Sequence, residues 1–134
     1  MLYLLDTDIA SYIIKSKSAA AERKLSSIPP AQLAISAITR AELLYGLKRL
    51  PANHRLHTVV QQFLRIIPVM AWEPEAADIY AEIRHQLVIS GQPIGEMDMM
   101  IAAHALVLGA TLVTNNLRHY ERIQMPLLLE NWSV

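Results

Sequence analysis

GQPIGEMDMMIAAHALVLGATLVTNN, residues 91–116, carries the clearest structural signal in the chain. Its first five residues hold two glycines and a proline, which is typical of a loop. Residues 98–108 then place apolar side chains at helical spacing and stop at Gly109, so they predict a helix that Asp98 opens. Thr111 to Thr114 follow as a short, largely apolar run that favours a buried strand. The stretch therefore predicts a loop, a helix and a strand in succession.

The same alternation of helices and short strands extends toward both ends of the chain. We expect strands at 2–5, 33–36, 68–72, 111–114 and 127–129, and helices at 9–14, 19–25, 37–50, 54–67, 75–90 and 98–108. Short apolar strands separated by helices are typical of a parallel sheet with helices on both faces, joined by right-handed crossovers. The sequence thus predicts an α/β fold with three layers.

The composition indicates one compact domain that covers residues 1–134. With 53% hydrophobic residues and no low-complexity tract, the chain can bury one sizeable core. The absence of cysteine excludes disulfides and thiolate metal sites, and it fits a reducing compartment, so we expect a cytoplasmic location. The sequence shows no signal-peptide pattern and no apolar run long enough to span a membrane, so we expect no membrane association.

Charge gives no general sign of a nucleic-acid partner. Twelve basic and twelve acidic residues cancel, so the broad positive field of many nucleic-acid-binding proteins is absent. RNA would have to be bound through local arrangement. The two basic stretches that could track a phosphate backbone are Lys15, Lys17, Arg23 and Lys24, and then Arg40, Lys48 and Arg49. The sequence leaves open whether either is more than scattered surface charge.

Three acidic residues are expected at the carboxyl edge of the sheet, where parallel α/β folds bind their ligands. Asp6 directly follows the first strand, Glu42 lies in the helix after the second, and Asp98 opens the helix that leads into the fourth. Ile38 and Tyr45 flank Glu42, and Asp98 also has apolar neighbours, so neither carboxylate is expected on a freely solvated face. The ordinary alternatives are a helix cap or a solvated residue.

Convergence of these acids would call for a divalent cation. Their mutual repulsion would be severe unless a cation with oxygen ligands neutralised it, and Mg²⁺ or Mn²⁺ is the natural choice. Zinc is disfavoured because the chain has no cysteine and the pair His54 and His57 lacks a third ligand. A hard metal ion in an acidic pocket can lower the pKa of a bound water and orient that water toward a phosphodiester. The pattern therefore favours hydrolytic nuclease chemistry.

Three motifs in order, LLDTD at 4–8, AISAITRAELLYGL at 34–47 and the stretch 91–116, resemble the PIN-domain family, especially its VapC group of toxins. The resemblance covers nearly the whole chain. It implies a four- or five-stranded parallel sheet, a homodimer, and Mg²⁺- or Mn²⁺-dependent endoribonuclease activity. It also implies cleavage of structured RNA, often transfer RNA, with inhibition of translation, and a VapB-type antitoxin that occupies the active site.

The resemblance assigns metal-binding and catalytic roles position by position. Asp6, Glu42 and Asp98 match the three principal metal-binding acids of the family. The fourth acid of the family falls just after the strand that ends at Thr114, where Asn116 is a closer match than Asn115. An asparagine can hydrogen-bond a metal-bound water but brings no charge, so a second metal would be held more weakly. Thr7 and Thr114 would supply hydroxyls near the metal water, or merely cap strand ends.

Other interpretations remain at this point. Asp8 is expected to cap the helix at 9–14, with an outer place near the metal as the alternative, and Glu96 is expected to be solvated. The start of the chain is also similar to aspartyl-phosphate phosphotransferases, but no lysine follows Lys48 to neutralise a phosphoryl group. A stronger alternative is a catalytically weak RNA- or protein-binding module, which Asn116 leaves open.

Overall fold

The computed structural model describes every residue from 1 to 134 and contains one parallel sheet. Its strands are β1 (Tyr3–Leu5), β2 (Leu33–Ser36), β3 (Val69–Met70), β4 (Thr111–Val113) and β5 (Leu128–Glu130). They are hydrogen-bonded in the order β3-β2-β1-β4-β5, with every neighbouring pair parallel. The predicted parallel α/β sheet is confirmed, with five strands and with β1 in its centre.

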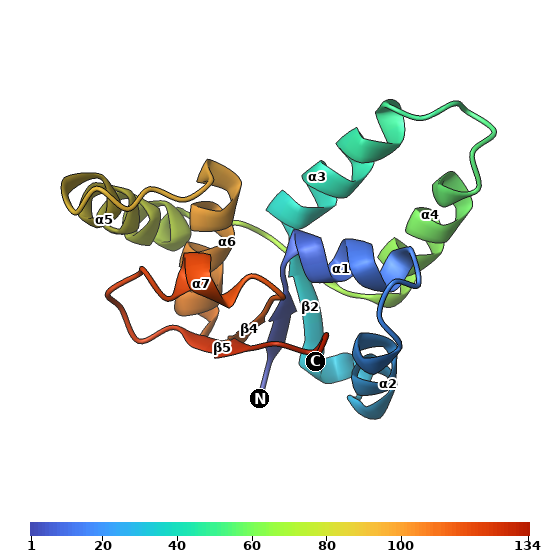
Figure 1. Cartoon of the computed structure of the whole chain (residues 1–134), viewed down its shortest axis with the longest axis horizontal. Coiled ribbons are helices and arrows are strands. Elements are labelled where there is room, and N and C mark those ends of the chain that lie inside the picture. Colours follow the sequence, from blue (N-terminus) through green and yellow to red (C-terminus); the bar gives the residue numbers. More distant parts are fainter.

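Helices cover both faces of this sheet (Figure 1). They are α1 (Thr7–Ile14), α2 (Ala19–Ser27), α3 (Ala37–Lys48), α4 (Leu56–Ile66), α5 (Pro74–Ile89), α6 (Glu96–Leu108) and the short α7 (Leu117–Tyr120). One apolar core joins the sheet to α1–α4, and a second joins it to α5–α7. The three-layer arrangement is therefore as predicted.

Alternation along the central strands feeds both cores. Leu5 and Ile35 belong to the core beneath α1–α4, whereas Leu4 and Ala34 belong to the core beneath α5–α7. Successive side chains of a strand point to opposite faces, so a strand covered on both sides needs apolar residues throughout. This requirement explains why the strands appear in the sequence as unbroken apolar runs.

Two helix starts differ from the sequence-based expectation. Asp6, not Asp8, caps α1: its Oδ1 accepts the backbone N–H of Ile9 at 2.8 Å, and Asp8 lies within the first turn. Helix α6 begins at Glu96, so Asp98 is its third residue rather than its first. Both differences arise because these helices begin earlier than the apolar periodicity that marked them. The short helix α7 was not predicted at all.

The carboxyl edge of the sheet is where α1 and α3 leave it. Helix α3 runs away from this edge and α4 returns toward the sheet, so that the pair forms a projecting arm (Figure 1). We use the term arm for α3, the turn after it and α4, residues 37–66. No helix in the structure combines the length and the apolar character needed to cross a lipid bilayer.

Candidate active site

Asp6 lies at the centre of the carboxyl edge, directly after β1, and its side chain is only 2% exposed. Besides the N–H of Ile9, it accepts a hydrogen bond from the side chain of Thr114, at the end of β4. The hydroxyl of Tyr120 lies 3.5 Å from its Oδ2. All of these partners are neutral donors. The buried carboxylate is thus held in place without a compensating positive charge.

Glu42 reaches the same region from α3. Its Oε1 accepts the hydroxyl of Thr7 at 2.6 Å, and that hydroxyl also lies 3.0 Å from the hydroxyl of Thr39. The predicted partial burial of Glu42 is confirmed, but the expected reason is wrong for Tyr45, which is 66% exposed. Contact with α1 through Thr7 is what withdraws the carboxylate from water.

Asp98 approaches from the first turn of α6 and is partly buried. The hydroxyl of Tyr120 donates to its carboxylate as well, so this tyrosine lies between Asp98 and Asp6. Burial and the two carboxylates raise the pKa of Tyr120, so that the hydroxyl remains a proton donor. Tyr120 was missed in the sequence because it belongs to the unpredicted helix α7.

Asp98 acts electrostatically on both Asp6 and Glu42, although no three acidic or histidine side chains are grouped closely enough to hold a metal ion. Burial, with smaller contributions from the negative charges of Asp8 and Asp98, raises the pKa of Asp6 to about 7. Burial also raises the pKa of Glu42, again with Asp98 and Asp8 contributing, and burial raises that of Asp98. These carboxyl groups therefore share one region of the molecule and repel one another when ionised.

Asp8 belongs to the same acidic region although it is exposed. Its charge raises the pKa of Asp6, Glu42 and Asp98, and it lines a groove beside Thr7 and Glu42. The capping role expected of it falls to Asp6 instead. The sequence does contain a signal for this proximity. Asp6 and Asp8 are two residues apart at the start of a helix, so whichever one caps the helix keeps the other nearby.

Asn116 lies in the turn that joins β4 to α7. Its backbone N–H donates to Thr114 Oγ1 at 2.9 Å, and its side-chain Nδ2 lies 2.8 Å from His119 Nδ1. The positive charge of His119 in turn lowers the pKa of Asp98. The amide therefore contacts the acids through Thr114 and His119 rather than directly. Glu96 is exposed and forms an ion pair with Arg84 at 3.3 Å.

The family model for the PIN domain matches residues 3–124 of the chain. This chain belongs to the PIN-domain family. The tRNA(fMet)-specific endonuclease VapC of Shigella flexneri is 35% identical over 131 residues, 98% of each chain, and the ribonuclease VapC2 of Haemophilus influenzae is 36% identical over 130 residues, 97% of each. Within the PIN-domain family, the chain accordingly falls in the VapC group.

Solved structures of this PIN-domain group have the same fold. A DNA-bound VapBC from Salmonella typhimurium matches with a TM-score of 0.90 and 36% identity, covering 98% of this chain and 99% of that one. VapBC2 from Rickettsia felis, bound to a DNA fragment from its promoter, matches with a TM-score of 0.89 and 34% identity over the same shares. The likeness therefore extends over the full sheet and both helical layers.

The donors of this PIN domain fit a hard divalent cation. No three histidine or acidic side chains are grouped closely enough to hold a metal ion by themselves. Mg²⁺ retains several of its waters and needs only one or two protein carboxylates, so such a group is not required. The only ion pair in the molecule is between Arg84 and Glu96, so none of Asp6, Glu42 and Asp98 forms one. A cation would relieve that uncompensated charge.

Proposed function

We propose that the chain is a Mg²⁺- or Mn²⁺-dependent endoribonuclease and the toxin of a VapBC-type toxin–antitoxin pair, with residues 1–134 acting as one catalytic domain. One observation carries the proposal: three carboxylates, one of them almost fully buried, lie in one region at the carboxyl edge of the sheet, and none of them forms an ion pair. Stability alone does not favour such a cluster, because each charge raises the cost of ionising the others. Membership of the PIN-domain family and the nuclease names of the relatives support it.

The catalytic residues proposed are Asp6, Glu42, Asp98 and Asn116, with the three acids as metal ligands. A bound divalent cation supplies a water of lowered pKa and neutralises charge at the phosphate. Thr7 fixes the carboxylate of Glu42, and Tyr120 keeps its proton and orients Asp6 and Asp98. Asn116 provides a neutral amide where further negative charge would add repulsion.

The proposed substrate is a structured RNA, and transfer RNA is the first choice. The relative from Shigella flexneri is named as an endonuclease specific for tRNA(fMet). Cleavage of a transfer RNA would inhibit translation, and this activity would take place in the cytoplasm, where transfer RNA is used.

A groove beside the acids is the proposed site for a VapB-type antitoxin. Its volume is about 400 Å³, and it lies between α1, α3 and α4, with Asp8 and Glu42 at its polar side and Leu43, Leu47 and Val60 among its apolar residues. An apolar floor next to a charged rim suits a protein segment. Homodimer formation is proposed as well, supported by the exposed apolar side chains of Val88 and Ile89 on α5.

The test is RNA cleavage with purified protein, Mg²⁺ or Mn²⁺, and mapping of the ends by sequencing. We expect discrete cuts that disappear with chelator and fall at least a hundredfold in Asp6→Asn, the size of effect expected when a charge in the metal site is lost. Asp78→Asn, an exposed aspartate on α5, is the matched control and should cut like the parent. Equal cleavage with and without chelator would contradict the proposal.

Asn116 favours a second candidate, a catalytically weak RNA- or protein-binding module. The acidic pocket would then serve only for docking, and the neutral amide at the fourth position would reflect a loss of catalysis. In the same experiment this candidate predicts RNA binding without metal-dependent cuts. It also predicts that Asp6→Asn binds RNA at least as well as the parent, since one negative charge has been removed.

A further inference from the structure

The neutral net charge conceals two regions of opposite sign. The arm, residues 37–66, carries Arg40, Lys48, Arg49, Arg55 and Arg65, with Glu42 as its only acid. The segment of residues 73–98, which contains α5 and the start of α6, carries Glu73, Glu75, Asp78, Glu82, Glu96 and Asp98, with Arg84 as its only lysine or arginine. These two segments belong to the helical layers on opposite faces of the sheet (Figure 1).

The cations of the arm have no role in holding the fold together. All five are exposed, and none forms an ion pair, because the only such pair in the molecule joins Arg84 to Glu96. What sets the arm apart is its excess of cations over acids. Five cations and one acid present a positive surface that an anion can approach.

This positive surface is continuous with the acidic site. Arg49 and Lys15 line the same groove as Asp8 and Glu42. Arg49, at the C-terminal cap of α3, follows Glu42 by seven residues, about two turns, so it lies on the same face of the helix and about 10.5 Å farther along its axis. A strand of RNA whose phosphate lies at the carboxylates can therefore place neighbouring phosphates against the arm.

We propose that the arm is the surface that binds the phosphate backbone of the RNA substrate, and that the acidic α5 layer keeps the RNA away from the other side. The inference rests on the proposed ribonuclease function and adds the path of the substrate to it. A phosphodiester backbone carries one charge per nucleotide and matches cations spread along two helices. The separated charges also orient the incoming polyanion before contact.

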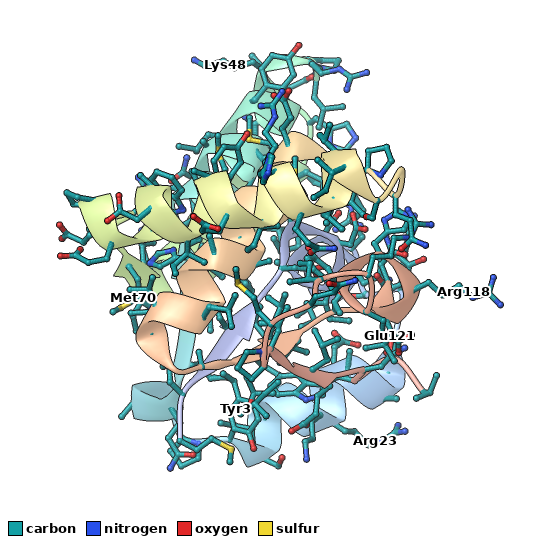
Figure 2. The ribbon with its side chains drawn as sticks, turned by 90° about the vertical axis from the view of Figure 1, so that its left-hand side faces the viewer. Tyr3, Arg23, Lys48, Met70, Arg118 and Glu121 are labelled. Atoms are coloured by element: carbon teal, nitrogen blue, oxygen red, sulfur yellow. The ribbon has the colours of Figure 1, made fainter.

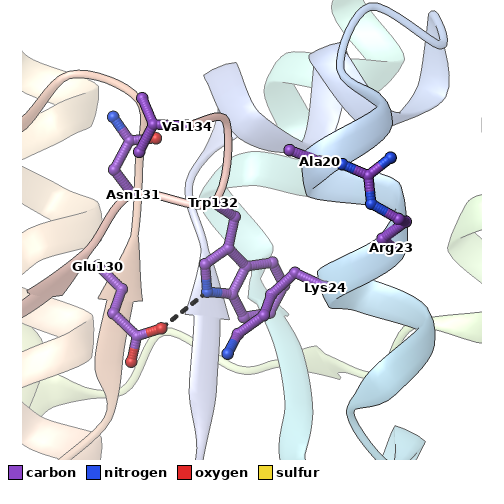
Figure 3. Close-up of a pocket in the computed structure, with 7 residues that line it drawn as sticks. All are labelled: Ala20, Arg23, Lys24, Glu130, Asn131, Trp132 and Val134. Carbon is purple, nitrogen blue, oxygen red and sulfur yellow. Dashed lines mark hydrogen bonds between the residues drawn. The ribbon is translucent and has the colours of Figure 1, made fainter.

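The test is the binding of a labelled transfer RNA to the protein. It is measured by fluorescence anisotropy at several salt concentrations, with chelator present so that the RNA is not cleaved. The variant is Lys48→Gln with Arg55→Gln at the end of the arm. The matched control is Arg23→Gln with Lys24→Gln on α2, which removes the same charge beside the C-terminal segment (Figure 3). Figure 2 shows Lys48 and Arg23 at opposite ends of the molecule.

We expect the arm variant to bind at least tenfold more weakly at low salt, with a salt slope shallower by about one to two charges. The control should bind within about twofold of the parent. A third variant, Glu75→Gln with Glu82→Gln on α5, should bind as tightly as the parent or more tightly. All six positions are exposed, so we expect each variant to keep the fold. Thermal unfolding of each variant checks this.

Equal weakening by the arm variant and the control, or no weakening by either, would overturn the inference. These outcomes are distinct from failure of the proposed function. If the parent cuts RNA and the arm variant binds like the control, the ribonuclease function is supported and the RNA-binding arm is contradicted. If binding depends on the arm but no metal-dependent cuts appear, the RNA-binding arm is supported and the ribonuclease function is contradicted.

Discussion

At the scale of single residues, Asp6 combines a structural task with a chemical one. It follows the central strand, caps α1 through Ile9, and places a carboxylate among other acids. A cap favours the ionised form, yet burial outweighs it and raises the pKa of Asp6 to about 7. The site is therefore built at a cost in stability as long as no cation is bound.

This cost predicts a dependence of stability on pH. The metal-free folded protein retains a proton on Asp6 up to about pH 7, whereas the unfolded chain releases it near the ordinary value of 3.8. The stability contributed by this group is therefore complete below the lower pKa and is lost as the pH rises to the upper one. We expect Asp6→Asn to raise the free energy of unfolding at pH 8 by roughly 1–3 kcal/mol, and by less at pH 5.

Urea unfolding of the metal-free parent and variant at both pH values provides the measurement. Asp78→Asn, where the aspartate is exposed, serves as control and should change little at either pH. A less stable Asp6→Asn protein at pH 8 would show that the cap outweighs the burial.

At the scale of helices and strands, two glycines differ in whether the backbone requires them. Gly109 lies where the backbone needs a positive φ, whereas Gly46 lies inside a helix, where alanine has the higher helix propensity. Gly109 ends α6 with a positive φ of 63°, which side chains other than glycine rarely adopt, while Gly46 lies inside α3 with open space around it. We expect Gly109→Ala to lower the free energy of unfolding by about 1 kcal/mol. Gly46→Ala should raise it by up to about 1 kcal/mol.

Denaturant unfolding of the two variants checks this pair, since both add the same methyl group. If Gly109→Ala proved neutral, the left-handed end of α6 would not be required. If Gly46→Ala proved destabilising, the space around that position would be smaller than the structure indicates.

The sequence predicted the elements whose signals are local. Leu33–Ser36 was placed without error, because a buried strand between prolines and a helix leaves an unbroken apolar run. The end of α6 was also predicted, because glycine at a helix terminus has a backbone reason. The acids at the carboxyl edge could be named because parallel strands all end there.

The features that were missed depend on distant partners. His104 is buried in α6, and its Nδ1 lies 2.8 Å from Ser36 Oγ, the cap of α3, sixty-eight residues away. Helix α7 is a single turn whose tyrosine is buried beside two acids, and four residues hold too little periodicity to be recognised. Whether a carboxylate points into the site or caps a helix likewise depends on its neighbours in space, as Asp6 and Asp8 show.

At the scale of the whole molecule, a site that destabilises the empty protein should stabilise the loaded one. A cation that binds only the folded state adds about 2.7 kcal/mol at a hundred times its dissociation constant. We expect Mn²⁺ or Mg²⁺ to raise the thermal midpoint of the parent and not that of Asp98→Asn. Na⁺ at equal ionic strength, and Asp78→Asn with the divalent ion, are the controls. Equal rises in the parent and in Asp98→Asn would place the cation elsewhere.

The central position of β1 also bears on how the chain is made. Tyr3 pairs with Leu33 in β2 on one side and with Thr111 in β4 on the other. Strand β1 is therefore synthesised long before β4, and the centre of the sheet forms only after β4 has been made. The hydrogen-bonding partners of Asp6, Thr114 and Tyr120, emerge later still. A nascent chain that still lacks Thr114 and Tyr120 therefore lacks the side-chain donors that hold the carboxylate of Asp6 in the site.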